Sequence, residues 1–555
     1  MTAAVSAIHF DSESRSFVLR LKTSAYLLRI LPEGAVRHVG FVPLPPEAPA
    51  TLAAAHLTEY KDANFVWDWQ GTPFEYPAFG DVSYREAAFK VAFTQALAEL
   101  TAEEAPHVPV RDVRLRYERH EIHPDAEPLG APAHGHPPQV ATPRETLCLR
   151  LKDELGDFYV TLFYRLTPEQ DLIERWVEVE NRTNAPVEIE TVDFGVLNLP
   201  CGHYELTRAA GAWAREFAPV TQPIEQGVFV LDQRGLNTGH AVNPFFHVCE
   251  RGQATEEAGT VYFGAIAWSG NWRLRFESLP GGNCRIFAGY EASDFALTLG
   301  PGESHKTPAF LFGCSSEGRG GASRRLHRFL RERVLPGHGP EEFRPVLYNS
   351  WEATYFDLSL ENQTELARVA ADIGVELFVV DDGWFGARRH DRAGLGDWVV
   401  SQDVFPGGLQ PLADEVRRLG MKFGLWVEPE MVNPDSDLYR AHPDWVLHFP
   451  GRPRTTSRTQ MILDFGRPEV VQYLLDALDA LVRENGVDFF KWDMNRYVSE
   501  PGSVAGKAIW RKHVEGLYRI WDALRRAHPH LDIQSCSGGG GRIDPGILAR
   551  ADQVW

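Results

Sequence analysis

The stretch Val487-Asp488-Phe489-Phe490-Lys491-Trp492-Asp493-Met494-Asn495-Arg496 decides the fold class of this chain. It begins as a short apolar run and ends in a cluster of polar side chains, and it lies between two longer segments with helical periodicity. A short apolar run in this setting predicts a strand that is buried on both faces. The polar cluster at its end combines an ammonium, an indole, a carboxylate, an amide and a guanidinium. It indicates a pocket that binds a polar, hydroxyl-rich ligand and performs acid–base or nucleophilic chemistry on it.

The same alternation of strand and helix fills the second half of the chain. Its helical segments have Pro at one start and Gly at several ends, as helix boundaries do. Besides the opening stretch, the predicted strands are Val346–Trp351, Leu377–Asp381, Lys422–Val427, Asp532–Cys536 and Ala551–Trp555, and the predicted helices are Leu360–Asp372, Leu412–Leu419, Val470–Val482 and Ala508–Ala527. Such alternation predicts a parallel sheet with right-handed crossovers, and a (β/α)8 barrel is the natural candidate.

The first half has a different pattern, in which short alternating strands are separated by turn residues. These strands are Ser16–Leu21, Thr146–Leu151, Phe158–Arg165, Leu172–Glu180, Val187–Leu197, Thr260–Ser269 and Trp272–Glu277. They predict a large antiparallel β-sandwich. Phe89–Leu100 is compatible with a helix or a strand, and Ala126–Pro143, rich in Pro, Gly and His, is predicted to be a surface loop.

The strand–turn pattern gives way to the strand–helix pattern at a basic helical stretch, Ala322–Val334, and the Pro- and Gly-rich segment after it. We interpret this change of pattern as a domain boundary. We therefore expect a β-sandwich domain over residues 1–320, a helical linker over 321–344, and an incomplete barrel of about six strands over 345–555.

The composition narrows the class of function. A chain of 555 residues is long enough for two or three domains with sizeable cores. The net charge of -20 disfavours nucleic acid and anionic membranes as partners, and no apolar run approaches the length of a membrane span. The first residues lack the features of a signal peptide, and the six scattered cysteines contain no Cys-x-x-Cys motif, which favours a cytoplasmic protein with reduced thiols. No convincing metal or nucleotide site is evident, so we expect no cofactor.

Polar or aromatic side chains follow five successive predicted strands. They are Asn349–Glu352, Asp381–Trp384, Trp426 with Glu428–Glu430, Lys491–Asp493, and Ser535–Gly541. In a barrel these strand ends converge on one face. Paired carboxylates accept hydrogen bonds from adjacent sugar hydroxyls, tryptophan offers a flat apolar wall, and glycine lets backbone N–H groups approach closely. The set predicts a carbohydrate pocket and a glycosidase.

Each of these signals has a simpler explanation when taken alone. Asp381 and Asp382 could be a loop pair or metal ligands, and the glycine run could be a flexible turn or a phosphate loop, although no Gly-Lys-Ser/Thr follows it. Trp426 could belong to the core, and Cys536 could be an inert buried thiol. The succession of five such strand ends favours the pocket.

Four motifs carry a resemblance to a known family. In chain order they are Leu377–Phe385, Leu425–Val432, Lys491–Arg496 and Cys536–Arg542, and Gly211–Glu216 and Asn243–Phe246 extend the match into the first half. They resemble the α-galactosidases of glycoside hydrolase family 36, the bacterial melibiase type. The resemblance implies a retaining exo-α-galactosidase that acts on small oligosaccharides of the melibiose and raffinose type and forms a homo-oligomer, with a tetramer suggested by the family.

The resemblance also implies roles for single residues. Asp493 would be the catalytic nucleophile, and Lys491 and Asn495 would bind hydroxyls near it. Further substrate-binding positions would be Asp381 and Asp382 for the far hydroxyls, Trp351 and Trp426 for the pocket walls, Arg458, and Cys536, Gly538 and Gly539 on the side of the sugar's second hydroxyl. A neighbouring subunit would contribute a tryptophan and an aspartate, which correspond here to Trp213 and, in a segment that departs from the family pattern, to Asp62.

The family's acid/base aspartate follows a motif that corresponds here to Gln553-Val554-Trp555, in a Thr-Ser-Asp continuation. We therefore expect that aspartate just beyond Trp555, in a longer form of the enzyme. Asp544 and Asp552 are the nearest carboxylates, and neither is predicted to point into the pocket. The alternatives are a galactose-binding protein without turnover, a galactosyl transferase, or an α-N-acetylgalactosaminidase, against which Cys536-Ser537-Gly538 speaks because it leaves little room for an acetamido group.

Overall fold

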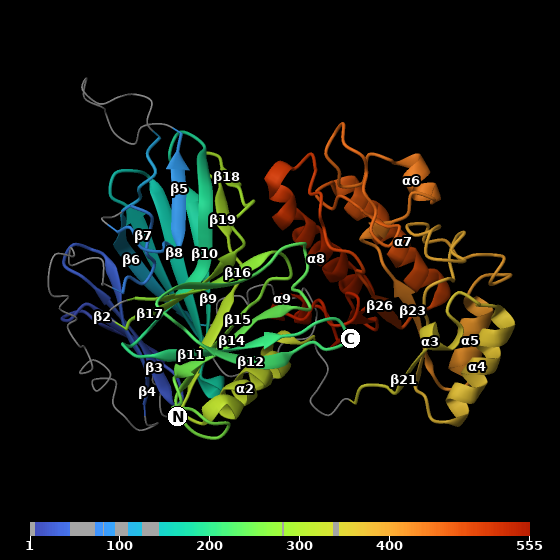
Figure 1. The fold of residues 1–555 in the computed structure, drawn as a ribbon, viewed down its shortest axis with the longest axis horizontal. Helices are drawn as coiled ribbons and strands as arrows, with labels where there is room; N and C mark the ends of the chain where they lie inside the picture. Colours follow the sequence, from blue (N-terminus) through green and yellow to red (C-terminus); the bar gives the residue numbers. More distant parts are fainter. Residues whose placement is uncertain are drawn as a thin grey trace.

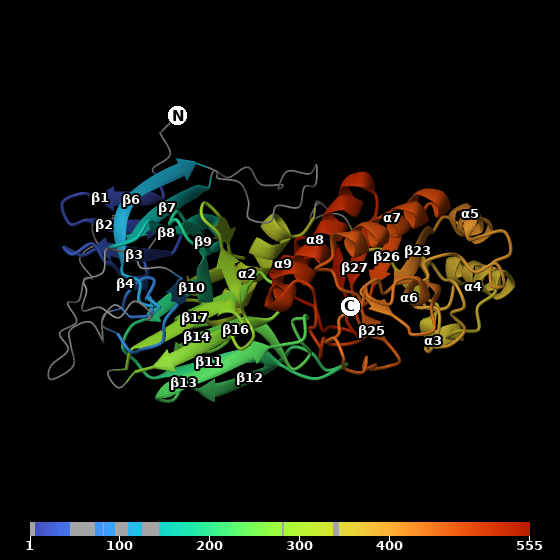
Figure 2. The ribbon, with the colours of Figure 1, turned by 90° about the horizontal axis from the view of Figure 1, so that it is seen from above.

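The structure, a computed structural model, describes residues 6–44, 73–80, 83–94, 109–124, 144–279, 282–336 and 343–555. An antiparallel β-rich part and an α/β part lie side by side (Figures 1 and 2). Within the described ranges, no helix combines the length and the apolar character needed to cross a bilayer. The predicted division into a β-domain followed by a parallel α/β domain is confirmed.

Among the described residues of the first part, three antiparallel sheets are present. One is a meander of β1 (Ile8–Asp11), β2 (Ser16–Arg20), β3 (Ser24–Ile30) and β4 (Val36–Pro43). The second follows the order β13-β16-β17-β10-β18, with β5 (Phe89–Phe93) also paired to β10; its other strands are β10 (Val187–Leu199), β13 (Gly227–Gln233), β16 (Trp272–Ser278), β17 (Cys284–Tyr290) and β18 (Leu297–Leu299).

The third and largest sheet follows the order β12-β11-β14-β15-β20-β9-β8-β7-β6, with β19 paired to β9. Its strands are β6 (Leu115–Pro124), β7 (Glu145–Asp153), β8 (Phe158–Thr167), β9 (Leu172–Asn181), β11 (Tyr204–Ala210), β12 (Ala218–Pro223), β14 (Val242–Glu250), β15 (Val261–Ile266), β19 (Ser304–Lys306) and β20 (Phe310–Ser315), with a short 3-10 turn, η1 (Pro168–Gln170), between β8 and β9.

Each strand predicted in the first half falls on an observed strand. The ambiguous segment is a strand over Phe89–Phe93, and its continuation from residue 95 lies outside the described residues, as does the predicted loop Ala126–Pro143. Helix α2 (Gly318–Phe329) and the π-helical turn η2 (Leu330–Val334) follow β20. Ala322, Leu326 and Phe329 of α2 pack in one apolar cluster with residues of β15 and β20.

The second part is a six-stranded parallel sheet, the arc of a half-barrel, in the order β21-β22-β23-β26-β27-β28. The strands are β21 (Leu347–Asn349), β22 (Leu377–Val380), β23 (Lys422–Val427), β26 (Phe489–Trp492), β27 (Asp532–Ser535) and β28 (Gln553–Val554), with a small antiparallel pair, β24 (Met431–Val432) and β25 (Met461–Ile462). The helices are α3 (Trp351–Thr354), α4 (Leu360–Asp372), α5 (Gln410–Arg418), α6 (Asp437–Ala441), α7 (Pro468–Asn485), η3 (Gly506–Ala508), α8 (Ile509–Ala527) and α9 (Pro545–Leu548).

Local sequence signals explain several of these boundaries. Ser359 and Asn362 form a reciprocal capping box at the start of α4. Pro468 occupies the first turn of α7, and Gly486 ends that helix with a left-handed φ of 60°. The predicted strand Val346–Trp351 is too long, because β21 stops at Asn349 and Trp351 already begins α3.

The register of the parallel strands brings their carboxyl ends level. Val380 pairs with Leu425, Val427 with Trp492, and Trp492 with Ser535. The residues that follow these positions therefore emerge together at one edge of the sheet.

The two parts share one hydrophobic core. A continuous cluster of buried residues runs from the first sheet to α8 and α9. At the junction the Trp268 ring meets the Tyr518 ring edge-on, with centroids 6.0 Å apart, and Ser269 donates a hydrogen bond of 2.9 Å to Asp544. The β-rich part is therefore packed firmly enough to present loops to the edge where the parallel strands end.

Candidate active site

A cavity of about 480 Å³ lies at the carboxyl edge of the parallel strands. It is lined from the half-barrel by Trp351, Glu352, Phe356, Asp381, Asp382, Arg388, Asp391, Trp426, Glu428, Arg458, Gln460, Lys491, Asp493, Asn495, Cys536, Gly538, Gly539 and Trp555, and from the β-rich part by Trp213 and His240. The structure brings together every predicted site residue except Asp62, which lies outside the described residues.

Asp493, directly after β26, accepts more hydrogen bonds than any other carboxylate that lines the cavity. Its Oδ1 accepts from the backbone N–H of Met494 (2.9 Å) and of Gly538 (3.0 Å). Its Oδ2 accepts from the side chains of Asn495 (2.7 Å) and Trp426 (3.1 Å). Burial raises the pKa of Asp493, but the Lys491 cation and the hydrogen bonds from Asn495 and Gly538 are among the effects that outweigh burial and hold the pKa below its ordinary value. The carboxylate is therefore ionised, and its four donors hold it in one orientation.

Lys491 lies between the two carboxylates Asp381 and Asp493. Its Nζ donates to Asp381 Oδ2 at 2.9 Å and lies 4.6 Å from the centre of the Trp555 ring. Burial lowers the pKa of Lys491, and the two carboxylates outweigh burial and raise it. The ammonium therefore stays charged beside Asp493.

Asp382 is held by an arginine that sequence reasoning did not single out. Arg388 donates from Nε to Oδ1 (2.9 Å) and from Nη2 to Oδ2 (2.7 Å), and its Nη1 donates to Asn433 (2.9 Å). Burial raises the pKa of Asp382, and this bidentate pair opposes the effect. Asp381 and Asp382 thus present two fixed acceptors to one side of the cavity.

Glu428 and Glu430 follow β23 and are both fully buried, yet they have opposite electrostatic surroundings. Burial and the nearby Asp493 raise the pKa of Glu428 to about 8, so it carries a proton at neutral pH. Its carboxyl accepts from the Asn495 N–H and from Gln460 Nε2 (2.8 Å).

Glu430 is an anion in a closed network. Burial would raise its pKa, but Arg542 and His513 lower it to about 2. Arg542 donates twice to its Oε1 (3.0 and 2.9 Å), and Trp492 donates to the same oxygen at 3.2 Å. Glu430 therefore joins β23, β26 and the loop after β27 without lining the cavity.

The remaining predicted residues form the rim and wall of the cavity. Arg458 and Thr459 both have left-handed φ values, 51° and 56°, so Arg458 projects from a strained turn. Cys536 is buried, and both burial and Asp493 raise the pKa of its thiol, which agrees with an inert wall residue.

Trp213 reaches the cavity of its own chain from the loop after β11 and is 72 % exposed. The resemblance assigned this tryptophan to a neighbouring subunit.

Asp544 and Asp552 do not line the cavity. Asp544 caps α9 by accepting from the N–H groups of Gly546 and Ile547. Asp552 pairs with Arg525 and accepts from the Ile533 N–H. The expectation that neither carboxylate points into the pocket is confirmed.

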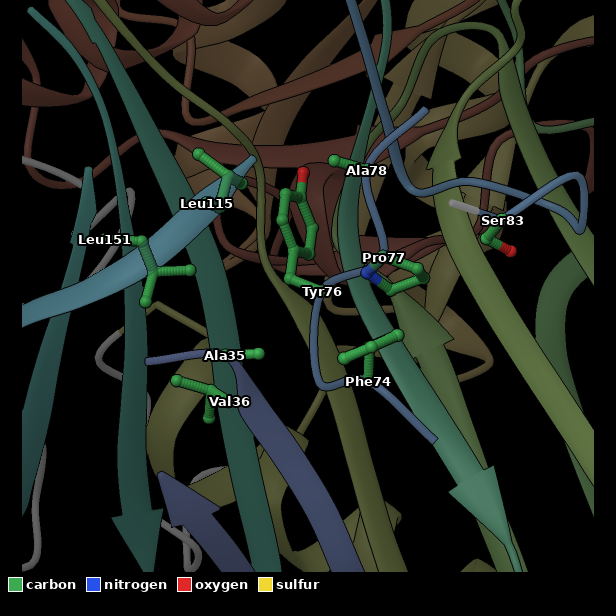
Figure 3. A pocket seen from close by; sticks show the side chains of 9 residues that line it. All are labelled: Ala35, Val36, Phe74, Tyr76, Pro77, Ala78, Ser83, Leu115 and Leu151. Atoms are coloured by element: carbon green, nitrogen blue, oxygen red, sulfur yellow. The ribbon is translucent and has the colours of Figure 1, made fainter. Parts of the chain in front are cut away.

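A second cavity, between β4, β6 and β7, cannot hold a sugar (Figure 3). Its volume is about 20 Å³, and its lining is mostly apolar, including Phe74, Leu115 and Leu151. This is room for about one water molecule.

Sequence reasoning missed several lining residues, above all Arg388, Gln460 and His240. Glu428 was among the polar residues predicted at the strand ends, but it was given no role in the site. Arg388 and His240 lie in loops whose spacing gives no hint of the site.

The arrangement suits nucleophilic attack on a hydroxyl-rich ligand. Asp493 is an ionised, immobilised nucleophile beside a cation, and Asp381, Asp382 and Arg458 are placed to hold hydroxyl groups. Trp351, Trp426 and Trp213 add apolar walls.

Comparisons with known proteins agree with this description. Residues 304–555 match the family model described as Melibiase, and residues 46–300 match the model of the glycosyl hydrolase family 36 N-terminal domain. The α-galactosidase AgaA of Geobacillus stearothermophilus is 35 % identical over 563 aligned residues, which cover 99 % of this chain and 75 % of the relative. The bifunctional α-galactosidase/sucrose kinase AgaSK of Mediterraneibacter gnavus is 31 % identical, and the match covers 99 % of this chain and 57 % of that relative.

Solved structures show the same similarity. A substituted form of AgaA in complex with stachyose superposes with a TM-score of 0.90 at 34 % identity, covering 97 % of this chain and 74 % of that one. Another, in complex with raffinose, gives a TM-score of 0.89 with the same identity and coverage.

Proposed function

The chain belongs to glycosyl hydrolase family 36, and on that premise we propose that it is a retaining exo-α-galactosidase whose nucleophile is Asp493. The supporting observation is the set of four N–H donors and the Lys491 cation around this carboxylate. A carboxylate that is ionised, desolvated and immobilised is suited to attack an anomeric carbon.

We propose terminal α-galactosyl residues of melibiose- and raffinose-type oligosaccharides as the substrate. Relatives of known structure bind raffinose and stachyose. Asp381 and Asp382, oriented by Lys491 and Arg388, would accept hydrogen bonds from galactose hydroxyls far from the anomeric carbon. Trp426 forms a fixed part of the cavity wall, because its indole N–H donates to Asp493 and only 3 % of its surface is exposed.

The reaction would proceed in two displacements. An Asp493 oxygen bonds to the anomeric carbon as the glycosidic bond breaks, and the leaving oxygen takes a proton from a general acid. Water then gives a proton to the conjugate base of that acid, attacks the same carbon and releases Asp493 as a carboxylate, with net retention of configuration.

A dinitrophenyl α-galactoside tests the nucleophile, because this leaving group needs no proton. Wild-type protein should release dinitrophenol and, with a fluorinated galactosyl fluoride, accumulate a covalent adduct that peptide mass spectrometry places on Asp493. Asp493→Ala should lose both signals and keep galactose binding measurable by calorimetry. Adduct formation on another residue would contradict the assignment.

Two alternatives are distinguished by the same preparation. A galactose-binding protein would bind the sugar and leave the aryl galactoside intact. An α-N-acetylgalactosaminidase would prefer the N-acetyl analogue of a nitrophenyl galactoside; the buried wall formed by Cys536 favours the plain galactoside.

We also propose a homo-oligomer in the cytoplasm, with domain boundaries near residues 320 and 345. Six cysteines without a paired motif support a reducing compartment. Sedimentation of the purified chain measures the oligomeric state.

A further inference from the structure

We propose that His240, on the β-rich part, is a positioning residue for the nucleophile: it holds the Gly538 carbonyl so that the Gly538 N–H stays directed at Asp493. This inference rests on the proposed function, in which Asp493 is the nucleophile. Nothing in the motifs of the half-barrel points to it, because His240 lies some 300 positions before the loop that it holds.

The loop after β27 needs such support. It contains four consecutive glycines, Gly538 to Gly541, and the first two have φ values of 53° and 91°. Glycine has more backbone freedom than any other residue, so a free loop of this composition would sample many conformations. One of its N–H groups must nevertheless stay 3.0 Å from Asp493 Oδ1.

The β-rich part holds this loop at several points. Gly541 O accepts from the Gly239 N–H (2.8 Å), and the Gly540 N–H donates to Glu216 (3.1 Å). Asn237 donates to Ser537 Oγ (2.9 Å). The approach is close: a Cβ on Gly541 would lie 2.8 Å from His240 Cε1.

His240 is the member of this set that contacts the glycine whose N–H reaches Asp493. Its Nε2 lies 2.9 Å from Gly538 O, and its Nδ1 lies 2.6 Å from the Tyr497 hydroxyl. A carbonyl oxygen can only accept, so Nε2 carries the proton. In the neutral ring Nδ1 then accepts from Tyr497, which sets the tautomer and the direction of the ring.

His240 acts on Asp493 through a single residue, Gly538. Gly538 accepts from His240 with its carbonyl and donates to Asp493 with its N–H, so the two bonds fix this glycine from both sides. The Gly538 N–H also helps to hold the pKa of Asp493 below its ordinary value, against the effect of burial. The charged or titratable groups facing His240 are Glu216, at 3.9 Å, and Tyr497.

The experiment uses the full chain and measures two quantities separately: the rate of Asp493 glycosylation with the dinitrophenyl α-galactoside, and the dissociation constant for galactose. His240→Ala should lower the glycosylation rate by about 10- to 100-fold, less than the roughly 100- to 1000-fold cost of removing a donor outright, because the Gly538 N–H is misdirected and not removed. Galactose binding should change by less than about threefold, since Asp381 and Asp382 are untouched. The acid limb of the pH–rate profile should move to higher pH.

Two further variants make the result specific. His240→Gln retains an N–H donor for the Gly538 carbonyl and should recover part of the rate, whereas Tyr497→Phe should cause a smaller loss because only the ring orientation is relaxed. His203→Ala is the control: His203 is exposed and precedes β11 at the end away from Trp213, about 20 Å along the strand. It should leave both quantities unchanged.

A wild-type glycosylation rate in His240→Ala would overturn the proposal. So would equal losses in the Ala and Gln variants accompanied by weaker galactose binding, because that pattern indicates general damage to the fold. If the wild-type protein forms no adduct on Asp493, the proposed function fails first and this inference falls with it.

Discussion

The adjacent carboxyls Glu428 and Glu430 give the sharpest test of the electrostatics of the site. Both are fully buried, and only Glu428 carries a proton at neutral pH. Its pKa of about 8, against an ordinary 4.5, means that the folded chain binds one more proton than the unfolded chain between these values. The stability that protonated Glu428 contributes is therefore fully present below pH 4.5, and it is lost as the pH rises toward 8.

The size of the effect follows from the pKa difference. At about 1.4 kcal/mol per pH unit, roughly 3.5 units correspond to about 5 kcal/mol. Glu428→Gln is uncharged at every pH and can keep the hydrogen bond from Asn495. Gln460 Oε1 has no partner among the described residues, so that amide can rotate to accept from the new side chain.

The assay is urea unfolding of both proteins from pH 5 to pH 9. The stability of Glu428→Gln relative to wild type should grow by about 1.4 kcal/mol per pH unit up to pH 8 and then level off. The two proteins share all other titrating groups, so the contributions of those groups to the pH dependence cancel in the difference between the two free energies of unfolding. A difference that does not change with pH would refute the assignment of a proton to Glu428.

Glu430→Gln is the matched control, because it alters the same residue type two positions away. It leaves Arg542 and His513 without their anion, so it should cost about 3–5 kcal/mol at pH 7. The stability that wild-type Glu430 contributes is present above pH 4.5 and is lost as the pH falls toward about 2. The two variants should therefore differ in the sign of their effect at pH 8.

Three further substitutions test other parts of the site and scaffold. Lys491→Met removes the cation that offsets burial of Asp493, so the pKa of Asp493 should rise and the acid limb of the glycosylation profile should move to higher pH; an unmoved limb would contradict this role. Arg388→Met leaves Asp382 buried without its partner and should weaken galactose binding at least about tenfold by calorimetry, whereas the exposed Arg392→Met should not. Ser359→Ala removes the cap of α4 and should lower the free energy of unfolding by about 1 kcal/mol with unchanged glycosylation; a large activity loss would count against a purely local effect.

The sequence predicted most elements of the parallel sheet because their signals are local. Leu360–Asp372 and Lys422–Val427 were predicted to the residue, since helical periodicity, glycine after a helix and apolar runs act over a few positions. The strand at Val346–Trp351 was overextended, because an apolar pattern does not show that Ser350 turns the chain.

The candidate site was predicted from strand ends for a related reason. In a parallel sheet the chain direction alone places the residues after Val380, Val427, Trp492 and Ser535 at one edge. The residue types at the strand ends, carboxylates, a lysine, tryptophans and glycines, then indicated carbohydrate chemistry before any contact was known.

Only the tertiary structure decided which charges and donors these groups meet. Glu428 and Glu430 are the same residue type in one motif, and their pKa values diverge because one faces Asp493 and the other faces Arg542. His240 and Arg388 act through contacts that no sequence period encodes. The sequence by itself determined that Asp493 ends a buried strand next to Lys491. Folding then brought the Trp426 and Gly538 donors and the β-rich part to Asp493, because these contacts depend on distances between segments far apart in the chain.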